Sequence, residues 1–222
     1  MGMSPAQTVQ SVVFDLDGTL WPPQSVVIPA YQKVFRHLDI PYPVYEALLE
    51  TLGHPFDVIW QKLMPDVSQE TRAHANELMA LAEAEMLGTI NVEPFVGVRD
   101  TLHRLRLRGV SLYILSNCEH HYLERVPDCL GIGGYFQERY CADDFPGLSK
   151  SQILERILPG MPHPVVMVGD RFHDIDAGRH SGLDTIACLY GFGKPEELRE
   201  ATHKAQSFVE VGDILLRMTA PI

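Results

Sequence analysis

The stretch Ser11-Val12-Val13-Phe14-Asp15-Leu16-Asp17-Gly18-Thr19 joins a short, mostly apolar run to a turn that holds two carboxylates. A run of this kind is typical of a strand that is buried on both faces of a parallel sheet. In an open parallel sheet, ligands bind beyond the carboxyl ends of the strands. We therefore expect Asp15 and Asp17 to lie at the ligand site of an α/β sheet.

Three further apolar runs resemble the first one, at residues 110–115, 165–168 and 185–189. Amphipathic stretches at 95–108 and 149–158 are expected to be helices that cover the sheet. Buried strands that alternate with helices form a doubly wound parallel sheet. The sequence therefore predicts an α/β fold with a Rossmann-like core.

The segment 23–93 follows another pattern, because it contains helical periodicity but no convincing strand. Prolines mark the breaks between its helical stretches. We expect an all-helical cap domain of residues 23–93, inserted into an α/β core domain of residues 1–22 and 94–222. The helical stretches expected within the cap are 28–38, 44–52, 56–63 and 68–87.

The composition is that of a folded globular protein, since 45% of the 222 residues are hydrophobic. The chain has 18 Lys and Arg against 29 Asp and Glu, and its formal net charge of −11 disfavours nucleic acid and anionic membrane surfaces as partners. No segment resembles a secretory signal or an apolar membrane span. We expect a cytoplasmic protein, a monomer or a homodimer. Its cysteines are expected to be buried thiols; they are Cys118, Cys129, Cys141 and Cys188.

Polar side chains follow other predicted strands as well. Ser116 and Asn117 come after the second apolar run, and Asp170 and Asp174 come after the third. A single Asp-x-Asp-Gly segment would be explained equally well as a solvated turn. Four carboxylates at one sheet edge, however, would repel one another unless a cation lay among them, and hard divalent cations prefer oxygen ligands. The pattern therefore predicts a Mg²⁺ site.

Four motifs, in this order along the chain, resemble those of the haloacid dehalogenase superfamily. The resemblance covers nearly the whole chain, and the segment 170–182 with Gly191-Phe192-Gly193 is especially similar to the phosphoglycolate-phosphatase-like branch. The predicted helical insert resembles the cap domain of that branch. The motifs are Asp15-Leu16-Asp17-Gly18-Thr19, Ser116-Asn117, Lys150, and Gly169-Asp170 with Asp174.

This resemblance implies a Mg²⁺-dependent phosphatase that hydrolyses a small phosphorylated metabolite. Asp15 would be the nucleophile that forms an aspartyl phosphate, and Asp17 would be the general acid and base. Asp15 and Asp170 would hold the metal directly. Asp174 would bind the metal through a water molecule or would orient the direct ligands, and the backbone carbonyl of Asp17 could be a further metal ligand. The residues implied to bind the phosphoryl group are Gly18, Thr19, Ser116, Asn117 and Lys150.

Other positions are less well defined by the resemblance. His54, in Gly53-His54-Pro55, resembles the cap loop that faces the active site, and it could contact the leaving group; a structural or exposed histidine is an equally good interpretation. Trp60 is interpreted as a core residue. The sequence departs from the family pattern at Trp21, after the first motif, and at Arg171, which places a cation beside the predicted metal site.

Alternative functions follow from the same residues. A phosphomutase of the β-phosphoglucomutase type would use Asp15 and Asp17 but return the phosphoryl group to a bound sugar. Dehalogenation would leave Asp17 and the metal ligands without a role. A phospho-receiver protein is disfavoured, because its acceptor carboxylate follows a later strand and no helical insert interrupts its first one.

Overall fold

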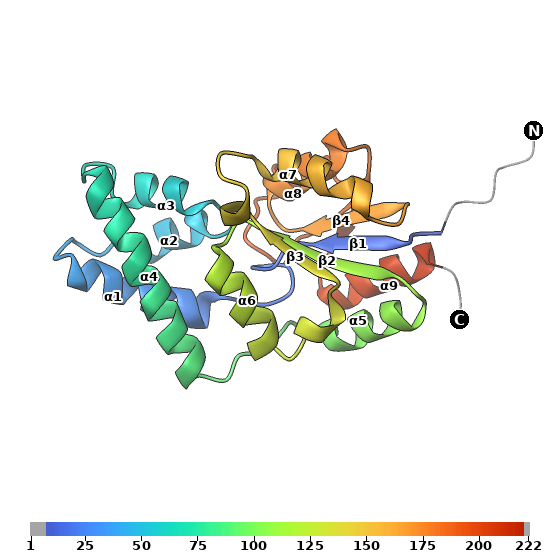
Figure 1. Cartoon of the computed structure of the whole chain (residues 1–222), viewed down its shortest axis with the longest axis horizontal. Coiled ribbons are helices and arrows are strands. Elements are labelled where there is room, and N and C mark those ends of the chain that lie inside the picture. Colours follow the sequence, from blue (N-terminus) through green and yellow to red (C-terminus); the bar gives the residue numbers. More distant parts are fainter. Residues whose placement is uncertain (1–7, 220–222) are drawn as a thin grey trace, which may run out of the picture.

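The computed structural model describes residues 8–219. Six parallel strands form one sheet in the order β3-β2-β1-β4-β5-β6, with β1 between β2 and β4 (Figure 1). The strand order reverses at β1, and doubly wound sheets bind their ligands in the crevice beyond such a point. The strands are β1 (Ser11–Phe14), β2 (Ser111–Ser116), β3 (Glu138–Cys141), β4 (Val165–Gly169), β5 (Asp184–Cys188) and β6 (His203–Ala205).

The doubly wound parallel sheet confirms the predicted fold class, but β3 and β6 have no counterpart among the four strands predicted from the sequence. Both are short, and they lie at the two edges of the sheet. Residues 138–140 of β3 are exposed or half-buried. An edge strand does not need apolar residues on both faces, so it lacks the sequence pattern of a buried strand.

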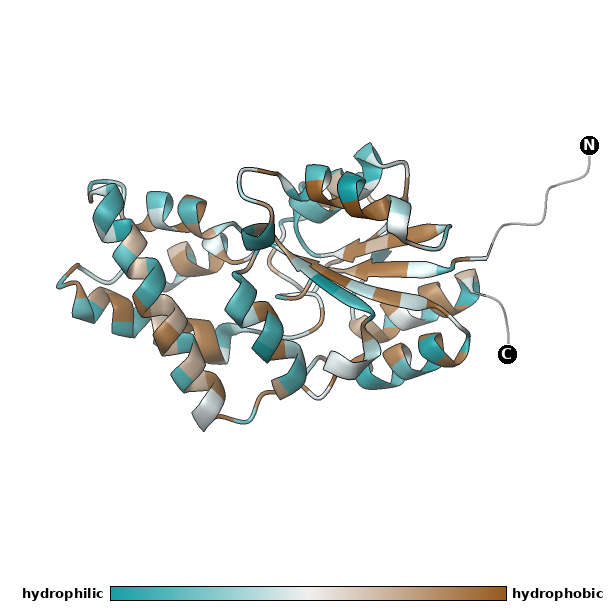
Figure 2. Ribbon diagram, viewed as in Figure 1, coloured by the Kyte–Doolittle hydropathy of each residue, from teal (hydrophilic) through white to brown (hydrophobic). Residues whose placement is uncertain are grey.

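Helices cover both faces of the sheet. α5 and α9 pack together on one face, and α7 and α8 pack together on the other (Figure 1). Side chains of β1 alternate between these layers, since Val12 and Phe14 join the core under α5 and α9, and Val13 joins the core under α7 and α8. Figure 2 shows the central strands as an apolar interior between helices with hydrophilic outer faces, whereas the edge strand β3 is largely hydrophilic. These helices are α5 (Val98–Leu107), α6 (His120–Cys129), α7 (Lys150–Ile157), α8 (Phe172–His180) and α9 (Phe208–Met218), with 3-10 turns at Gly133–Tyr135, Ala142–Asp144 and Leu158–Gly160.

Between β1 and α5 the chain forms four helices and no strand, as the sequence predicts. α1 packs along α4, and the rings of Tyr31 and Phe35 pack against Trp60. Trp60 is buried, which confirms its interpretation as a core residue. α4 begins after Ser68, whose hydroxyl accepts a hydrogen bond from the Thr71 N–H. The inserted helices are α1 (Gln24–His37), α2 (Tyr45–Thr51), α3 (Phe56–Leu63) and α4 (Gln69–Thr89).

Two further expectations concern the surface and the thiols. No helix within residues 8–219 has both the length and the apolar character needed to cross a membrane. Cys118, Cys141 and Cys188 are buried free thiols, as expected. The expectation is wrong for Cys129, which is exposed because it ends α6 at the surface.

Candidate active site

Three carboxylates and one ammonium group meet at the carboxyl edge of the sheet. Asp15 follows β1, Asp170 follows β4, and Asp174 lies in the first turn of α8. One oxygen atom of each lies within 4.8 Å of the others. Lys150 begins α7, and its Nζ donates hydrogen bonds of 2.6 Å to Oδ1 of Asp15 and to Oδ1 of Asp174. Four residues that the sequence analysis assigns to the site are therefore in direct proximity.

The loops after β1 and β5 hold the carboxylate of Asp170. The Thr19 hydroxyl donates to Asp170 Oδ1 over 3.3 Å, and the Phe192 N–H donates to Asp170 Oδ2 over 2.6 Å. Gly18 has a φ of +78°, and a Cβ at this position would lie 2.4 Å from Asp170 Oδ2. Glycine is needed here both for the backbone conformation and for the close approach. The Thr19 side chain thus contacts a carboxylate of the cluster, whereas the family resemblance implies that Thr19 binds phosphate.

The start of α8 positions Asp174. Its Oδ2 accepts a hydrogen bond of 2.9 Å from the N–H of Arg171, the residue that precedes the helix. A Cβ at Gly169 would lie 2.1 Å from Asp174 Cγ, so the end of β4 must carry a glycine for the carboxylate to fit. An acid in the first helical turn is also favoured by the positive end of the helix dipole.

The carboxylate cluster carries an excess of negative charge. Asp15, Asp170 and Asp174 are buried, and Lys150 is the single ammonium group that is hydrogen-bonded to them among residues 8–219. Burial raises the pKa of Asp15 to about 6, against the opposing effect of Lys150, and it raises the pKa of Asp170 well above its ordinary range. A hard divalent cation fits this donor set, because carboxylate oxygens are its preferred ligands and its charge offsets the excess.

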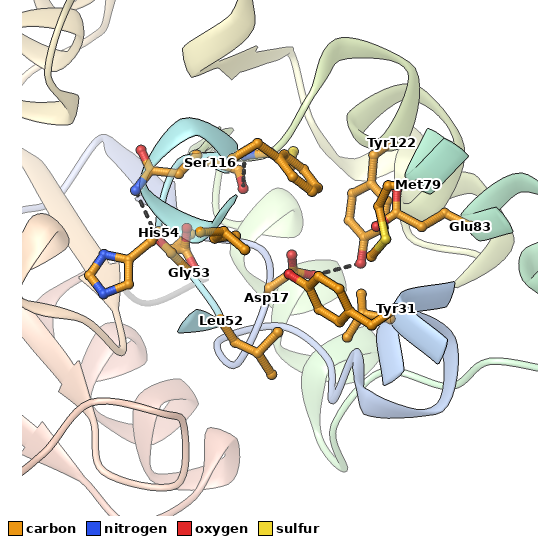
Figure 3. Close-up of a pocket in the computed structure, with 15 residues that line it drawn as sticks. Asp17, Tyr31, Leu52, Gly53, His54, Met79, Glu83, Ser116 and Tyr122 are labelled. Atoms are coloured by element: carbon orange, nitrogen blue, oxygen red, sulfur yellow. Dashed lines mark hydrogen bonds between the residues drawn. The ribbon is translucent and has the colours of Figure 1, made fainter. Parts of the chain in front are cut away.

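Asp17 points into a pocket beside the inserted helices (Figure 3). Trp21 Nε1 and Tyr122 OH both donate to its Oδ1, over 2.8 and 3.0 Å. Burial raises the pKa of Asp17 to about 7, and the charge of Asp15 adds to this rise. Its carboxyl group can therefore exchange a proton near neutral pH, as a general acid and base must. Its side chain does not belong to the carboxylate cluster, which leaves its backbone carbonyl as the candidate metal ligand.

The pocket has a volume of about 40 Å³ and lies between the strand ends and the inserted helices. Ser116 and Asn117 line it from the end of β2. Ser116 Oγ accepts a hydrogen bond of 3.3 Å from the Cys118 N–H, and Asn117 Nδ2 donates one of 2.9 Å to the Gly53 carbonyl. The inserted helices add mostly apolar walls, which include Val27, Tyr31, Ile59 and Met79.

His54 lines the same pocket but has several polar neighbours of its own. Its Nδ1 lies 3.1 Å from His173 Nε2, and its Nε2 lies 3.1 Å from Lys62 Nζ and 3.2 Å from a terminal nitrogen of Arg171. Burial, followed by the positive charge of Arg171, lowers the pKa of His54 to about 4. Its ring is therefore neutral at neutral pH, and its nitrogens contact other side chains of the protein.

Arg171, whose role the sequence does not define, connects the core to the inserted segment. Its guanidinium donates to the carbonyl of Leu52 and, over 3.2 Å, to Glu197 Oε2. The third contact is the one to His54. The side chain is buried, so these bonds are shielded from water. Arg171 thus fixes the segment 52–54 over the site.

The residues 12–188 match the family model described as haloacid dehalogenase-like hydrolase. This chain belongs to the haloacid dehalogenase-like hydrolase family. The match runs from the second residue of β1 to the end of β5 and includes every motif residue named above.

Relatives of this hydrolase-family chain carry different activities in their names. It is 27% identical over 197 residues to the tyrosine-protein kinase PtkA of Mycobacterium tuberculosis, covering 87% of this chain and 66% of that protein. The chain thus spans just under two thirds of the length of that relative. It is 26% identical over 223 residues to the phosphoglycolate phosphatase of Vibrio vulnificus, covering 95% of this chain and 97% of that protein. A crystal structure of a hydrolase from Pseudomonas syringae shares the fold, with a TM-score of 0.79 and 17% identity over 96% of this chain and 100% of that one.

Two residues beside Asp17, Tyr122 and Glu83, are not among the site residues predicted from the sequence of this family member. Tyr122 shares with Trp21 the task of holding Asp17, although the sequence shows Trp21 only as a departure from the family pattern. Glu83 lines the pocket from α4. Its sequence signal is its spacing, since it stands four residues from buried Met79 and four from buried Leu87 on the same helix.

Proposed function

We propose that this chain is a Mg²⁺-dependent phosphatase that hydrolyses a small phosphorylated metabolite through an aspartyl phosphate on Asp15. The observation that carries the proposal is the pairing of two carboxylates with different surroundings. Asp15 is buried beside Lys150 and the other carboxylates. Asp17 faces the pocket and accepts hydrogen bonds from Trp21 and Tyr122. One carboxylate is thus suited to attack and the other to proton transfer.

In the first half of the reaction, an oxygen of Asp15 attacks phosphorus and the bond from phosphorus to the leaving oxygen breaks. Asp17 donates its proton to that leaving oxygen, so the product departs as a neutral alcohol. The Lys150 ammonium, the Ser116 hydroxyl and the Asn117 N–H are the groups proposed to stabilise the phosphoryl oxygens. A bound Mg²⁺ would be held by Asp15, Asp170 and Asp174, and it supplies positive charge for the approach of two anions.

In the second half, water attacks phosphorus and the bond to the Asp15 oxygen breaks. Asp17, now ionised, accepts a proton from the water, and phosphate leaves while the Asp15 carboxylate is restored. The pKa of Asp17 near 7 suits both directions of proton transfer.

We further propose that residues 23–93 act as a cap over a core made of residues 1–22 and 94–222. Arg171 and His54 join the two parts, and the apolar walls of the pocket exclude bulk water from the reacting groups. The names of the relatives support phosphoryl transfer, to water in the phosphoglycolate phosphatase and to tyrosine in PtkA.

The test is phosphate release from p-nitrophenyl phosphate and from a panel of phosphorylated metabolites, with Mg²⁺ and with EDTA. We expect release that requires Mg²⁺ and that disappears in Asp15→Asn. Asp176→Asn, a change in α8 outside the carboxylate cluster, should keep the wild-type rate. Transfer of the phosphoryl group to a bound sugar or to a protein tyrosine, with no release of phosphate, would contradict the proposal.

A further inference from the structure

Glu83 is a buried acid whose place in the proposed mechanism is undefined. It lies on α4, is 2% exposed, and lines the pocket that contains Asp17. Figure 3 shows it beside Tyr122 and Met79, at the end of the pocket away from His54. Its Oε2 accepts no hydrogen bond from the described residues 8–219.

The nearest polar partner of Glu83 within the protein is His121, and it does not satisfy the carboxylate fully. His121 Nε2 forms an ion pair with Glu83 Oε2 over 3.6 Å, but this distance is too long for a hydrogen bond, and neither atom has a hydrogen-bond partner among the described residues. Burial raises the pKa of Glu83, and His121 opposes that rise. An unsatisfied buried carboxylate is costly, and native proteins rarely retain one without a partner. The missing donor is explained if the ligand of the pocket brings it.

The remaining walls restrict what that ligand can be. The described residues that line the pocket include no lysine and no arginine. The nearest Lys and Arg side chains already have partners. Lys150 is hydrogen-bonded to Asp15 and Asp174, where the phosphoryl group is proposed to bind. Arg171 is hydrogen-bonded to the Leu52 carbonyl and to Glu197. A leaving group with its own carboxylate or second phosphate would meet the negative charge of Glu83, and the one cationic group beside Glu83 among the described residues, His121, already forms an ion pair with it.

We propose that Glu83 determines substrate specificity by accepting a hydrogen bond from an N–H or O–H group of the leaving alcohol. This proposal rests on the proposed phosphatase function and adds the class of substrate, a phosphate monoester of a small amino alcohol or polyol that carries no second anionic group. Tyr31 and Met79 contact the carbon skeleton of that alcohol, and Asp17 protonates its oxygen.

Four two-carbon esters provide a matched test, since they differ in a single terminal group. They are 2-aminoethyl phosphate, 2-hydroxyethyl phosphate, ethyl phosphate without a donor, and phosphoglycolate with a carboxylate. We expect the wild-type enzyme to have higher kcat/KM for the two donor esters than for the other two. In Glu83→Gln this preference falls by about 10-fold through KM, because the amide keeps an acceptor oxygen but loses the charge that strengthens the hydrogen bond, while ethyl phosphate is unaffected and phosphoglycolate improves.

Two control variants separate specificity from structure. Glu85→Gln changes an exposed acid on the same helix and should leave all four values of kcat/KM unchanged. If Glu83 served only as an ion-pair partner of His121, then Glu83→Gln and His121→Gln would lower kcat/KM for all four esters by one common factor, and the proposal would be overturned. Circular dichroism and the melting temperature establish that each variant is folded.

The failure of this inference can be told apart from the failure of the proposed function. Preference of the wild-type enzyme for phosphoglycolate overturns the role of Glu83 while phosphate release still supports the phosphatase. Hydrolysis of p-nitrophenyl phosphate without turnover of either donor ester would likewise overturn the role of Glu83 and still support the phosphatase. Absence of phosphate release from every ester, including p-nitrophenyl phosphate, refutes the phosphatase itself.

Discussion

Substitution of Lys150 by methionine tests the charge balance of the site. The Lys150 ammonium is 3% exposed in its side chain and donates hydrogen bonds of 2.6 Å to both Asp15 and Asp174. Methionine has a similar length but no charge, so the variant keeps the packing and leaves the three buried carboxylates without their ammonium partner. We expect Lys150→Met to be less stable than the wild type in EDTA.

The magnitude follows from the burial of both partners. Removal of one member of a buried ion pair costs about 3–5 kcal/mol, because the remaining charge is left without compensation. For a chain of 222 residues, each kcal/mol lowers the melting temperature by about 2–4 °C, which gives a fall of about 6–20 °C. The cost should be smaller at low pH, where Asp15 and Asp170 take up protons.

Thermal unfolding in EDTA, followed by circular dichroism, measures this difference. Lys194→Met is the matched control, since Lys194 is exposed and pairs with Glu50 at the surface; its melting temperature should stay at the wild-type value. Added Mg²⁺ should stabilise Lys150→Met more than the wild type, because the variant site is more negative. Equal melting temperatures of Lys150→Met and the wild type in EDTA would refute the account of the carboxylate cluster.

Three further predictions concern protons and the cap. In EDTA, Asp15 and Asp17 hold their protons more tightly in the folded state than in the unfolded state, since the pKa of Asp15 rises from 3.8 to about 6 and that of Asp17 to about 7; their contribution to stability, measured by urea unfolding of the wild type against Asp15→Asn and Asp17→Asn, should therefore be greatest below about pH 4 and fall toward about pH 7, and saturating Mg²⁺ should flatten this fall. Asp17→Asn should lower kcat by about 10²- to 10⁴-fold without loss of stability at neutral pH, as stopped-flow phosphate assays and thermal melts would show; wild-type turnover would remove its acid and base role. Arg171→Met leaves the Leu52 carbonyl without its donor, at a cost of about 1–3 kcal/mol, and should speed hydrogen exchange at the amides of residues 52–54; unchanged exchange there would mean that Arg171 does not hold this segment.

The parts of the fold that sequence predicts well are those with strong local patterns. The run before Asp15 is buried on both faces and has one clear interpretation. Helix Phe56–Leu63 begins and ends at the predicted residues, and Pro55 marks its start. β6 has three residues and no apolar alternation, so its pairing with β5 depends on tertiary contacts. Such strands cannot be predicted from local sequence, because they form only by pairing with the rest of the sheet.

The residues of the candidate site likewise fall into a group that the sequence predicts and a group that it does not. Asp15, Lys150, Asp170 and Asp174 follow strand ends or open helices, so topology alone brings them to one edge. Tyr122 and Glu83 reach the site from the faces of helices, and their direction depends on how α6 and α4 pack. The Arg171 guanidinium likewise contacts Leu52, which is 119 residues away in sequence. Contacts of this range need the folded chain.

The most direct test of the central claim is to trap the covalent intermediate. Substrate labelled in its phosphoryl group would be mixed with enzyme and Mg²⁺, quenched in acid within one turnover, and the labelled peptide identified by mass spectrometry. We predict label on Asp15 and none in Asp15→Asn; with p-nitrophenyl phosphate, whose leaving group departs without a proton, Asp17→Asn should carry more label because only hydrolysis of the intermediate is slowed. Phosphate release by Asp15→Asn at the wild-type rate, or label on a residue other than Asp15, would contradict the central claim.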